Sequence, residues 1–547
     1  MRDENGEGMR VRINFLLCLA LAGAVVTAYS PVFRAGYTNW DDPAYTFRNR
    51  SVQGLSTANL KTIFTDFSLA NYHPVTGLSF AVENSLFGER AAAHHAVNLL
   101  LHVLNAALVF ALLSLLSGQR PAAFAAALIW ALHPANVESV AWIAERKNLL
   151  YSFFYLAALI TYLRHLEAGG RRYYLCAFGL FILALGSKAA AVTLPLALLL
   201  LEAFRGETLT AGAVKRAAPF FAAALLFTAL AVAAQSSGGR ILTARAPALL
   251  SFYLMKAVFP FGFSAVYPYG ETLAAFKAAQ LFYLLPALAF VAVFWAACQK
   301  NRPAAWGLAF FAVHILPFIS LIPVGGIIAA DRYLYLPAIG LVWALLSLAQ
   351  AALPATSAAR KLAFASVAAL ALTMGTATLE RAKVWTSSLA LWTDTLAKFP
   401  EDITANLNMA HALLEQGDRK KAVEYYFKVL KADPTQPDAL YNLGTLYGQA
   451  GRYKEALELL KAAVSANPKN ELAWNNLGLV FYGQKLYKDA QKAFKMAAAA
   501  GPSYAPAYAN LAETEAALGD CGAARGHYSA ALNFGFPPAD GRLKNCR

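Results

Sequence analysis

Long apolar runs alternate with short polar connections from the start of the chain to about residue 380. A helix needs about 20 apolar residues to cross a hydrocarbon core ~30 Å thick, so runs near this length predict membrane spans. About eleven such runs are present, at 12–33, 93–117, 121–141, 148–165, 172–187, 189–204, 217–235, 278–298, 304–324, 332–350 and 362–379. This pattern predicts an all-α fold in which residues 1–380 form a polytopic helical membrane domain.

Basic side chains mark alternate connections between these runs. The polar start carries Arg10 and Arg12, and the connections on the same side carry Arg120, Arg164, Arg171, Arg172, Arg205, Lys215, Arg216, Lys300, Arg302, Arg360 and Lys361. Because basic residues gather on the cytoplasmic side of a membrane, we expect a cytoplasmic N-terminus. The first run lacks a convincing small-residue cleavage site and is expected to be retained. An odd number of crossings then places the C-terminal region on the outer face, together with the segment 236–277.

After residue 380 the apolar runs give way to a period of about 34 residues. Small, bulky and proline positions recur in phase, at Ala422, Ala456, Ala490 and Ala524, at Tyr426, Leu460, Phe494 and Tyr528, and at Pro434, Pro468 and Pro502. The pattern resembles the tetratricopeptide repeat, in which paired helices stack into a concave surface for a peptide or protein partner. It predicts a linker helix over 381–402, four repeats over 403–538 and a tail over 539–547. Cys521 and Cys546, in the last repeat and the tail, form either a disulfide or two unpaired thiols.

The composition supports a membrane protein and argues against nucleic-acid binding. Hydrophobic residues make up 58% of the 547 residues and charged residues only 14%, which is too apolar for a soluble chain of this length. The net charge of +15 is explained by the basic connections, so no nucleic-acid partner is expected.

Asp41 and Asp42 form an acidic pair in a polar segment that directly follows the first apolar run. Two adjacent carboxylates raise each other's pKa unless a cation or a basic group shares the site. A carboxylate there could take a proton from an acceptor hydroxyl, or hold a divalent cation against a phosphate leaving group. The alternative is an ordinary turn, because the surrounding residues are turn formers.

Three basic residues near outer ends of the runs are candidates for binding a phosphate. Arg332 begins a span on the side where positive charge is otherwise avoided, and a guanidinium matches phosphate through its fixed fork of donors. Lys188 lies at the tip of a tight hairpin, where a snorkelling lysine is the alternative. Arg146 lies in the third connection, where it and Lys147 could instead simply pair with Glu145.

Four histidines and one acid are candidates for lining a substrate pocket. His73 precedes a short amphipathic stretch, and His133 and Glu138 lie in the third connection. His95 and His102 share one face of the second span with two asparagines, because these residues recur at helical spacing. Hydrogen bonding between helices is favoured over metal ligation for this stripe, since no acidic ligand accompanies it on the helix.

Taken in order, these motifs resemble the transmembrane and tetratricopeptide repeat-containing (TMTC-like) glycosyltransferases of the GT-C class. The resemblance rests on segments 39–43, 72–80, 133–141, 186–188 and 331–337, followed by the repeats. It implies inverting transfer of a sugar from a polyprenyl-phosphate-linked donor to a hydroxyl of an acceptor protein or glycan, with Asp41 the favoured base. A divalent cation, Mg²⁺ or Mn²⁺, held by Asp41 and Asp42 is an open option.

The chain has only four repeats, fewer than many members of that family. Protein O-mannosylation is therefore not inferred from the resemblance. We expect a multi-pass protein of a bacterial inner membrane, with catalysis and the repeats in the periplasm. The repeats would then recruit the acceptor or a partner protein. The alternative is a catalytically inactive, membrane-anchored repeat scaffold for protein assembly.

Overall fold

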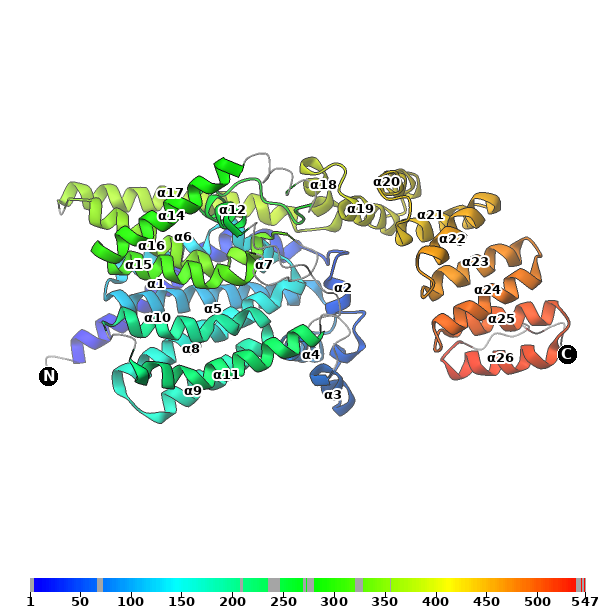
Figure 1. The fold of residues 1–547 in the computed structure, drawn as a ribbon, viewed down its shortest axis with the longest axis horizontal. Helices are drawn as coiled ribbons and strands as arrows, with labels where there is room; N and C mark the ends of the chain where they lie inside the picture. Colours follow the sequence, from blue (N-terminus) through cyan, green and yellow to red (C-terminus); the bar gives the residue numbers. More distant parts are fainter. Residues whose placement is uncertain are drawn as a thin grey trace. The chain divides into compact units, whose positions relative to one another are not determined.

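The computed structural model describes residues 4–65, 72–206, 210–234, 246–268, 272, 280–319, 328–354, 356–537, 543 and 546. Every regular element among these residues is a helix, as the apolar runs and the repeat period predicted. The chain divides into two compact units, Met1–Thr395 and Leu396–Arg547. Both can be followed in Figure 1.

The first unit is a helical bundle. Its α-helices are α1 (Glu4–Ala28), α2 (Asp42–Tyr45), α3 (Thr57–Thr65), α4 (Pro74–Phe87), α5 (Ala91–Ser117), α6 (Arg120–Ala131), α7 (Val137–Ala141), α8 (Arg146–Ala168), α9 (Arg171–Ser187), α10 (Leu194–Phe204), α11 (Ala211–Ala234), α12 (Ala246–Val258), α14 (Gln280–Lys300), α15 (Arg302–Ile315), α16 (Pro337–Ala352) and α17 (Ser357–Val384). Short 3₁₀ helices join several of them: η1 (Ser30–Arg34), η2 (Arg50–Val52), η3 (Pro134–Asn136), η4 (Ile143–Glu145), η5 (Ala189–Thr193), η7 (Leu316–Phe318) and η8 (Asp331–Leu334). Helix α8 packs between α5 and α9, and these helices run side by side in Figure 1.

The expected count of about eleven spans is not established. Five helical segments of the described chain are long and apolar enough to cross a membrane: Ala91–Ser117, Ile143–Ala168, Ala211–Ala233, Phe282–Lys300 and Ser357–Val384. Five more apolar segments are shorter: Arg12–Ala28, Arg120–Ala131, Ala189–Phe204, Ala246–Val258 and Pro337–Ala352. These helices are typical of a membrane protein. Residues 320–324, the end of the predicted span 304–324, lie outside the described residues.

Proline explains why the run 121–141 is not one long helix. Helix α6 ends at Ala131, and Pro134 follows in η3. Proline lacks a backbone N–H and disfavours the helical conformation in the residue before it, so the helix stops short. Conversely, the segment 236–277, expected on the outer face, contains the apolar helix α12.

Two glycines bring α15 and α16 into backbone contact. A Cβ atom added to Gly307 would lie 2.4 Å from the carbonyl oxygen of Gly340, and one added to Gly340 would lie 2.3 Å from that of Gly307. No other residue has a side chain small enough for this approach, so the two positions fix how closely these helices pack.

The second unit is a stack of four helical hairpins, which the 34-residue period predicted. The helices are α19 (Ile403–Glu415), α20 (Arg419–Ala432), α21 (Pro437–Gln449), α22 (Tyr453–Ala466), α23 (Glu471–Gly483), α24 (Tyr487–Ala500), α25 (Ala505–Ala517) and α26 (Cys521–Asn533). Helix α18 (Ser388–Lys398) precedes them and begins in the first unit. The bulky position Phe494 of α24 packs closely on α23, since a Cβ added to Gly478 would lie 2.5 Å from its ring.

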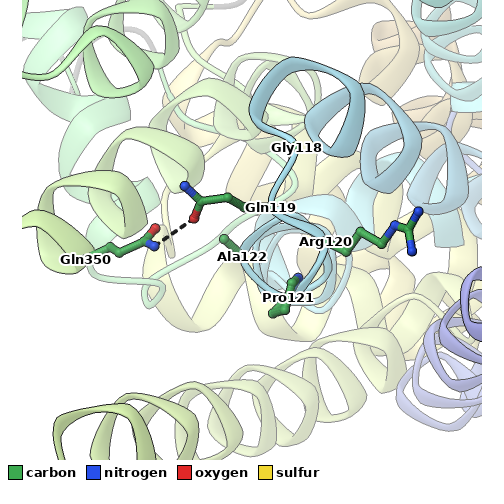
Figure 2. A pocket seen from close by; sticks show the side chains of 6 residues that line it. All are labelled: Gly118, Gln119, Arg120, Pro121, Ala122 and Gln350. Carbon is green, nitrogen blue, oxygen red and sulfur yellow. Dashed lines mark hydrogen bonds between the residues drawn. The ribbon is translucent and has the colours of Figure 1, made fainter. Parts of the chain in front are cut away.

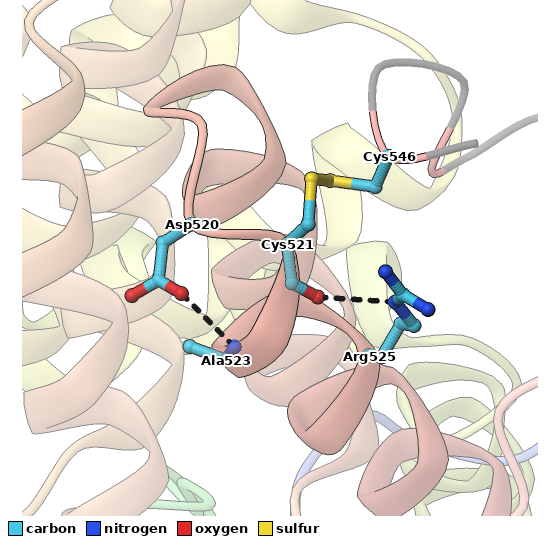
Figure 3. The surroundings of a disulfide bond; sticks show 5 residues. All are labelled: Asp520, Cys521, Ala523, Arg525 and Cys546. Carbon is cyan, nitrogen blue, oxygen red and sulfur yellow. Dashed lines mark hydrogen bonds between the residues drawn. A yellow bond between two sulfur atoms is a disulfide. The ribbon is translucent and has the colours of Figure 1, made fainter.

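A disulfide joins the start of the last helix to the C-terminal tail. Cys521, the first residue of α26, is bonded to Cys546, as Figure 3 shows. The same end of α26 is capped by Asp520, whose side chain accepts a hydrogen bond from the backbone N–H of Ala523 at 3.1 Å. Of the two alternatives for these cysteines, the structure has the bonded pair; most of the tail 539–547 lies outside the described residues.

We expect Gly307→Ala to destabilise the bundle by about 1–3 kcal/mol, because the new methyl group would force α15 and α16 apart. Gly375→Ala is the matched control, since Gly375 also lies inside a helix and its nearest neighbour, Leu132, is 3.8 Å from the new Cβ. Thermal unfolding of the purified protein in detergent measures the difference. An unfolding temperature for Gly307→Ala equal to that of the control would contradict the packing argument.

Candidate active site

Asp42 anchors the loop that carries the acidic pair. One carboxylate oxygen accepts hydrogen bonds from the backbone N–H and the hydroxyl of Thr38, both at 2.8 Å, and the other accepts from the backbone N–H of Ala144 at 2.9 Å. Burial raises the pKa of Asp42 to about 6, although these hydrogen bonds favour the ionised form. Both oxygens are therefore occupied, and Asp42 ties the loop to η4.

Asp41, one residue earlier, has a free carboxylate. Its side chain makes no hydrogen bond or ion pair with another described residue, and it is partly exposed. Burial raises its pKa, Lys147 and Arg332 nearby lower it, and Glu145 raises it. An unpartnered carboxylate with a raised pKa beside cations is suited to accept a proton.

The cations near Asp41 gather around Glu145, a buried residue of η4. Its carboxylate lies 3.1 Å from the Nζ of Lys147, 3.1 Å from the Nζ of Lys188 and 3.4 Å from the Nε of Arg332. Lys188 also donates to the side-chain oxygen of Asn148 at 2.9 Å. Three segments far apart in the sequence thus converge on one carboxylate, in what we term the Glu145 cluster, completed by Glu138.

Glu138 holds the other side of Arg332. Its carboxylate accepts from the Arg332 guanidinium and, at 2.7 Å, from the Arg332 backbone N–H. Burial and the neighbouring Glu145 raise the pKa of Glu138, and Arg332 opposes them. The cluster contains three cations, Lys147, Lys188 and Arg332, against two carboxylates, so its formal charge is +1 when all five groups are ionised. Burial of an excess positive charge favours an anionic ligand.

Arg146 lies in a different cluster. Its guanidinium pairs with Glu83 and donates to the side-chain oxygen of Asn98 at 2.8 Å and to the backbone oxygen of His94 at 3.0 Å. The side chain is fully buried. The structure therefore brings Lys188 and Arg332 together but not Arg146, whose partners are all groups of the protein.

The histidine stripe of α5 makes hydrogen bonds within the bundle. His102 contacts the hydroxyl of Tyr335 at 2.8 Å and the backbone oxygen of Ala131 at 3.0 Å. His95 contacts the backbone oxygen of Gly36 at 3.2 Å. Both rings have protein partners, as the hydrogen-bonding interpretation of the stripe expects.

His133 and His73 differ in their surroundings. His133 accepts from the N–H of Ala135 at 3.2 Å and donates to the backbone oxygen of Ala257 at 3.1 Å, and burial lowers its pKa to about 4. Burial, and then repulsion by Lys147 and Lys188, lower the pKa of His73 to about 3. His73 is thus the predicted pocket histidine within electrostatic reach of the Glu145 cluster.

Sequence reasoning did not select Glu145 and Lys147. Adjacent residues of a helix point about 100° apart, and here Arg146 pairs with Glu83 whereas Lys147 pairs with Glu145. Nothing in the order of these residues indicates which of the two would face Glu145. Trp142, close to these residues in the sequence, is an indirect signal, because aromatic faces attract cations. Its ring lies 5.3 Å from the Arg332 guanidinium and 5.8 Å from the Lys147 ammonium.

A separate pocket of about 600 Å³ is lined by Gly118, Gln119, Arg120, Pro121, Ala122 and Gln350. Gln350 donates to Gln119 at 2.7 Å, and Figure 2 shows Arg120 pointing away from this amide pair. Gln350 lies near the end of α16, whereas Arg332 precedes its start. The pocket and the Glu145 cluster are therefore at opposite ends of that helix, and the pocket is not part of the candidate site.

For a divalent cation, the acidic pair offers one free carboxylate. Among the residues described, no group of three His, Cys, Asp or Glu side chains could hold a metal ion. The oxygens of Asp42 are taken by N–H and O–H donors, which leaves Asp41. Mg²⁺ is often held by one or two carboxylates together with substrate phosphate and water, so Asp41 fits a cation that is shared with the substrate.

The repeats match known sequence models. Two models described as "Tetratricopeptide repeat" match residues 413–480 and 372–437. This confirms the tetratricopeptide repeats predicted from the period.

The chain is also similar to protein O-mannosyl-transferases. A protein O-mannosyl-transferase of Caenorhabditis elegans is 26% identical over 418 residues, which cover 73% of this chain and 58% of the relative. Human TMTC1 is 23% identical over 436 residues, which cover 69% of this chain and 49% of the relative. The chain spans about half the length of the curated relatives it matches. The chain is thus similar to TMTC proteins and contains tetratricopeptide repeats, as the ordered motifs predicted.

Solved structures match a part of the chain. MamA (residues 41 to end) from Desulfovibrio magneticus is 26% identical, covers 27% of this chain and 83% of its own, and has a TM-score of 0.26. PilF of Pseudomonas aeruginosa is 23% identical, covers 30% of this chain and 71% of its own, and has a TM-score of 0.27. Likenesses at these TM-scores carry no argument about function.

We expect Asp42→Ala to destabilise the protein by about 2 kcal/mol or more, because buried N–H groups of Thr38 and Ala144 would lose their acceptor. Asp41→Ala should stay within about 0.5 kcal/mol of the wild type, since the Asp41 carboxylate bonds to no described residue. Thermal unfolding in detergent compares the two. Equal losses of stability in the two variants would show that the neighbouring acids have equivalent structural roles, which would contradict the anchoring role given to Asp42 alone.

Proposed function

We propose that this TMTC-like chain is an integral-membrane glycosyltransferase that transfers a sugar from a polyprenyl-phosphate-linked donor to a hydroxyl of an acceptor protein or glycan. The observation that carries the proposal is the free carboxylate of Asp41 beside the positively charged Glu145 cluster. The similarity to relatives named protein O-mannosyl-transferases supports it.

In the proposed reaction, Asp41 is the general base. It takes the proton of the acceptor hydroxyl as that oxygen forms a bond to the anomeric carbon of the sugar. The bond between the anomeric carbon and the phosphate oxygen breaks on the opposite face, so the configuration inverts. The polyprenyl phosphate leaves with the bonding electron pair.

The Glu145 cluster would stabilise this leaving phosphate. Lys188 and Arg332 supply charged donors, and Lys147 adds a third cation. In our proposal Glu138 and Glu145 hold these side chains in position, which reduces the cost of ordering them when the phosphate binds. His73 would line the same region, whereas Arg146, His95, His102 and His133 would support the fold.

A divalent cation, if one is required, would be held by Asp41 together with the donor phosphate and would neutralise charge on that phosphate. The partners in this proposal are the lipid-linked sugar, the membrane lipid and an acceptor brought by the repeats. The expected location is a bacterial inner membrane, with the N-terminus in the cytoplasm and the repeats in the periplasm.

We expect Asp41→Asn to lower the transfer rate by about 10²–10⁴-fold, because the amide cannot accept the proton. Membranes containing the protein would receive undecaprenyl-phosphate mannose labelled in the sugar, with total periplasmic protein as acceptor, and then other lipid-linked hexoses. Glu455→Gln, which changes an exposed acid on the repeats, is the matched control. Normal turnover by Asp41→Asn would refute the assignment. A wild type that transfers none of these sugars would favour the anchored scaffold.

The pH dependence of donor capture tests the role of Lys188. Burial, followed by repulsion from Lys147 and Arg332, lowers the pKa of Lys188 to about 8. Its positive charge is present below that pH and is lost as the pH rises through it. We expect kcat/KM for the donor to fall about tenfold between pH 7 and pH 9. Lys188→Arg should remove this slope because a guanidinium stays charged; the same slope in both proteins would exclude Lys188.

A further inference from the structure

The segment that follows the last long apolar helix contacts the loop bearing Asp41. The indole N–H of Trp392 donates to the side-chain oxygen of Asn39 at 2.7 Å, and the backbone N–H of Asn39 donates to the hydroxyl of Ser388 at 2.9 Å. The N–H of Gly36 donates to the backbone oxygen of Thr386 at 3.1 Å. Residues 386–392 therefore hold two points of this loop.

Aromatic stacking adds a third point. The ring of Trp40 stacks on Trp142 with centroids 4.5 Å apart and meets the edge of Trp392 at 5.4 Å. Trp142 in turn stacks on Trp385 at 5.6 Å. Trp142, Trp385 and Trp392 are almost completely buried. The residue directly before Asp41 is thus packed against the wall of the Glu145 cluster on one side and against α18 on the other.

Asp41 depends on these neighbours for its position. Its own carboxylate bonds to no described residue, so it is held through Asn39 and Trp40 on one side and Asp42 on the other. A general base must lie within hydrogen-bond reach of the proton it removes, and misplacement by about 1 Å can cost about 100-fold in rate. Contacts that fix the flanking residues therefore bear on the reaction itself.

Ser388 and Trp392 also belong to the helix that leads into the repeats. Helix α18 runs without a break from Ser388 to Lys398, and the second unit begins at Leu396. The end of α18 that contacts the loop lies in the first unit. One helix therefore both contacts the loop that bears Asp41 and continues into the second unit.

We propose that Trp392, together with Ser388, positions the Asp41 loop, so that α18 is a positioning element of the transferase as well as a connection to the repeats. This inference rests on the proposed function of Asp41. Simple core packing would predict that a change at Trp392 alters stability alone. A positioning role predicts that it alters catalysis in a folded protein.

The test compares two tryptophan-to-phenylalanine variants of the full-length protein. Trp392→Phe keeps an aromatic ring but loses the donor to Asn39. Trp385→Phe is the matched control, because the buried Trp385 indole N–H has no hydrogen-bond partner among the described residues and no such bond is lost. The probe is the labelled lipid-linked sugar on which the wild type is active, and unfolding temperatures in detergent are measured alongside.

We expect Trp392→Phe to lower kcat about tenfold relative to Trp385→Phe, with little change in the donor KM, because the described interactions of Trp392 are with Asn39 and Trp40 and not with the phosphate-binding candidates. The acidic limb of the kcat–pH profile should move to lower pH, since a looser loop lets water reach Asp41. Asn39→Ala should give a similar loss, and the double variant should be no worse than either single one, because both remove the same bond.

Several outcomes separate this inference from the proposed function. If the wild type and Trp385→Phe are active and Trp392→Phe matches them in kcat and pH profile, the positioning role is wrong. If no variant, including the wild type, transfers sugar, the proposed function fails first. Should Trp392→Phe fold poorly, Ser388→Ala removes the acceptor of the Asn39 N–H with a smaller change, and a kcat equal to the wild type would then overturn the inference.

Discussion

The Glu145 cluster is the arrangement on which the membrane unit's candidate site depends. One buried carboxylate meets cations from the start of α8, from the tip after α9 and from η8, and Glu138 of α7 completes the group. Removing charges from water costs several kcal/mol for each ion, and only close opposite charges offset that cost. Loss of one member would leave others buried and uncompensated. The cluster therefore joins four segments of the chain, and its excess positive charge also suits it to bind an anion.

Two neighbouring residues show why the same chemistry can serve structure or function. Arg146 is enclosed by Glu83, Asn98 and a backbone oxygen, so each nitrogen of its guanidinium already has a protein partner. Lys147 faces Glu145 in a group with one more cation than carboxylates. The helical turn between adjacent residues puts them in separate environments. Charge and sequence position alone could not have distinguished them.

Much of the fold could be predicted from periodicity, but contacts between distant segments could not. The repeat register at Ala422, Ala456, Ala490 and Ala524 predicted the hairpins, because each repeat packs only on its neighbours. The acidic pair was visible, yet the difference between Asp41 and Asp42 depends on Thr38 and on Ala144, about 100 residues away. The count of spans is less secure than the helices themselves, because hydropathy does not show where a helix ends, as α6 does before Pro134.

The disulfide at Cys521 distinguishes one end of the repeat array from the other. Stacked repeats contact only their neighbours, so such arrays fray from their ends, where one interface is missing. At the C-terminal end, Cys546 of the tail is bonded to Cys521 at the start of α26. The tail therefore stays attached to the start of this helix while the bond is oxidised, and reduction would release it. The redox state of the compartment would then decide whether a protease meets a tethered or a free chain end there.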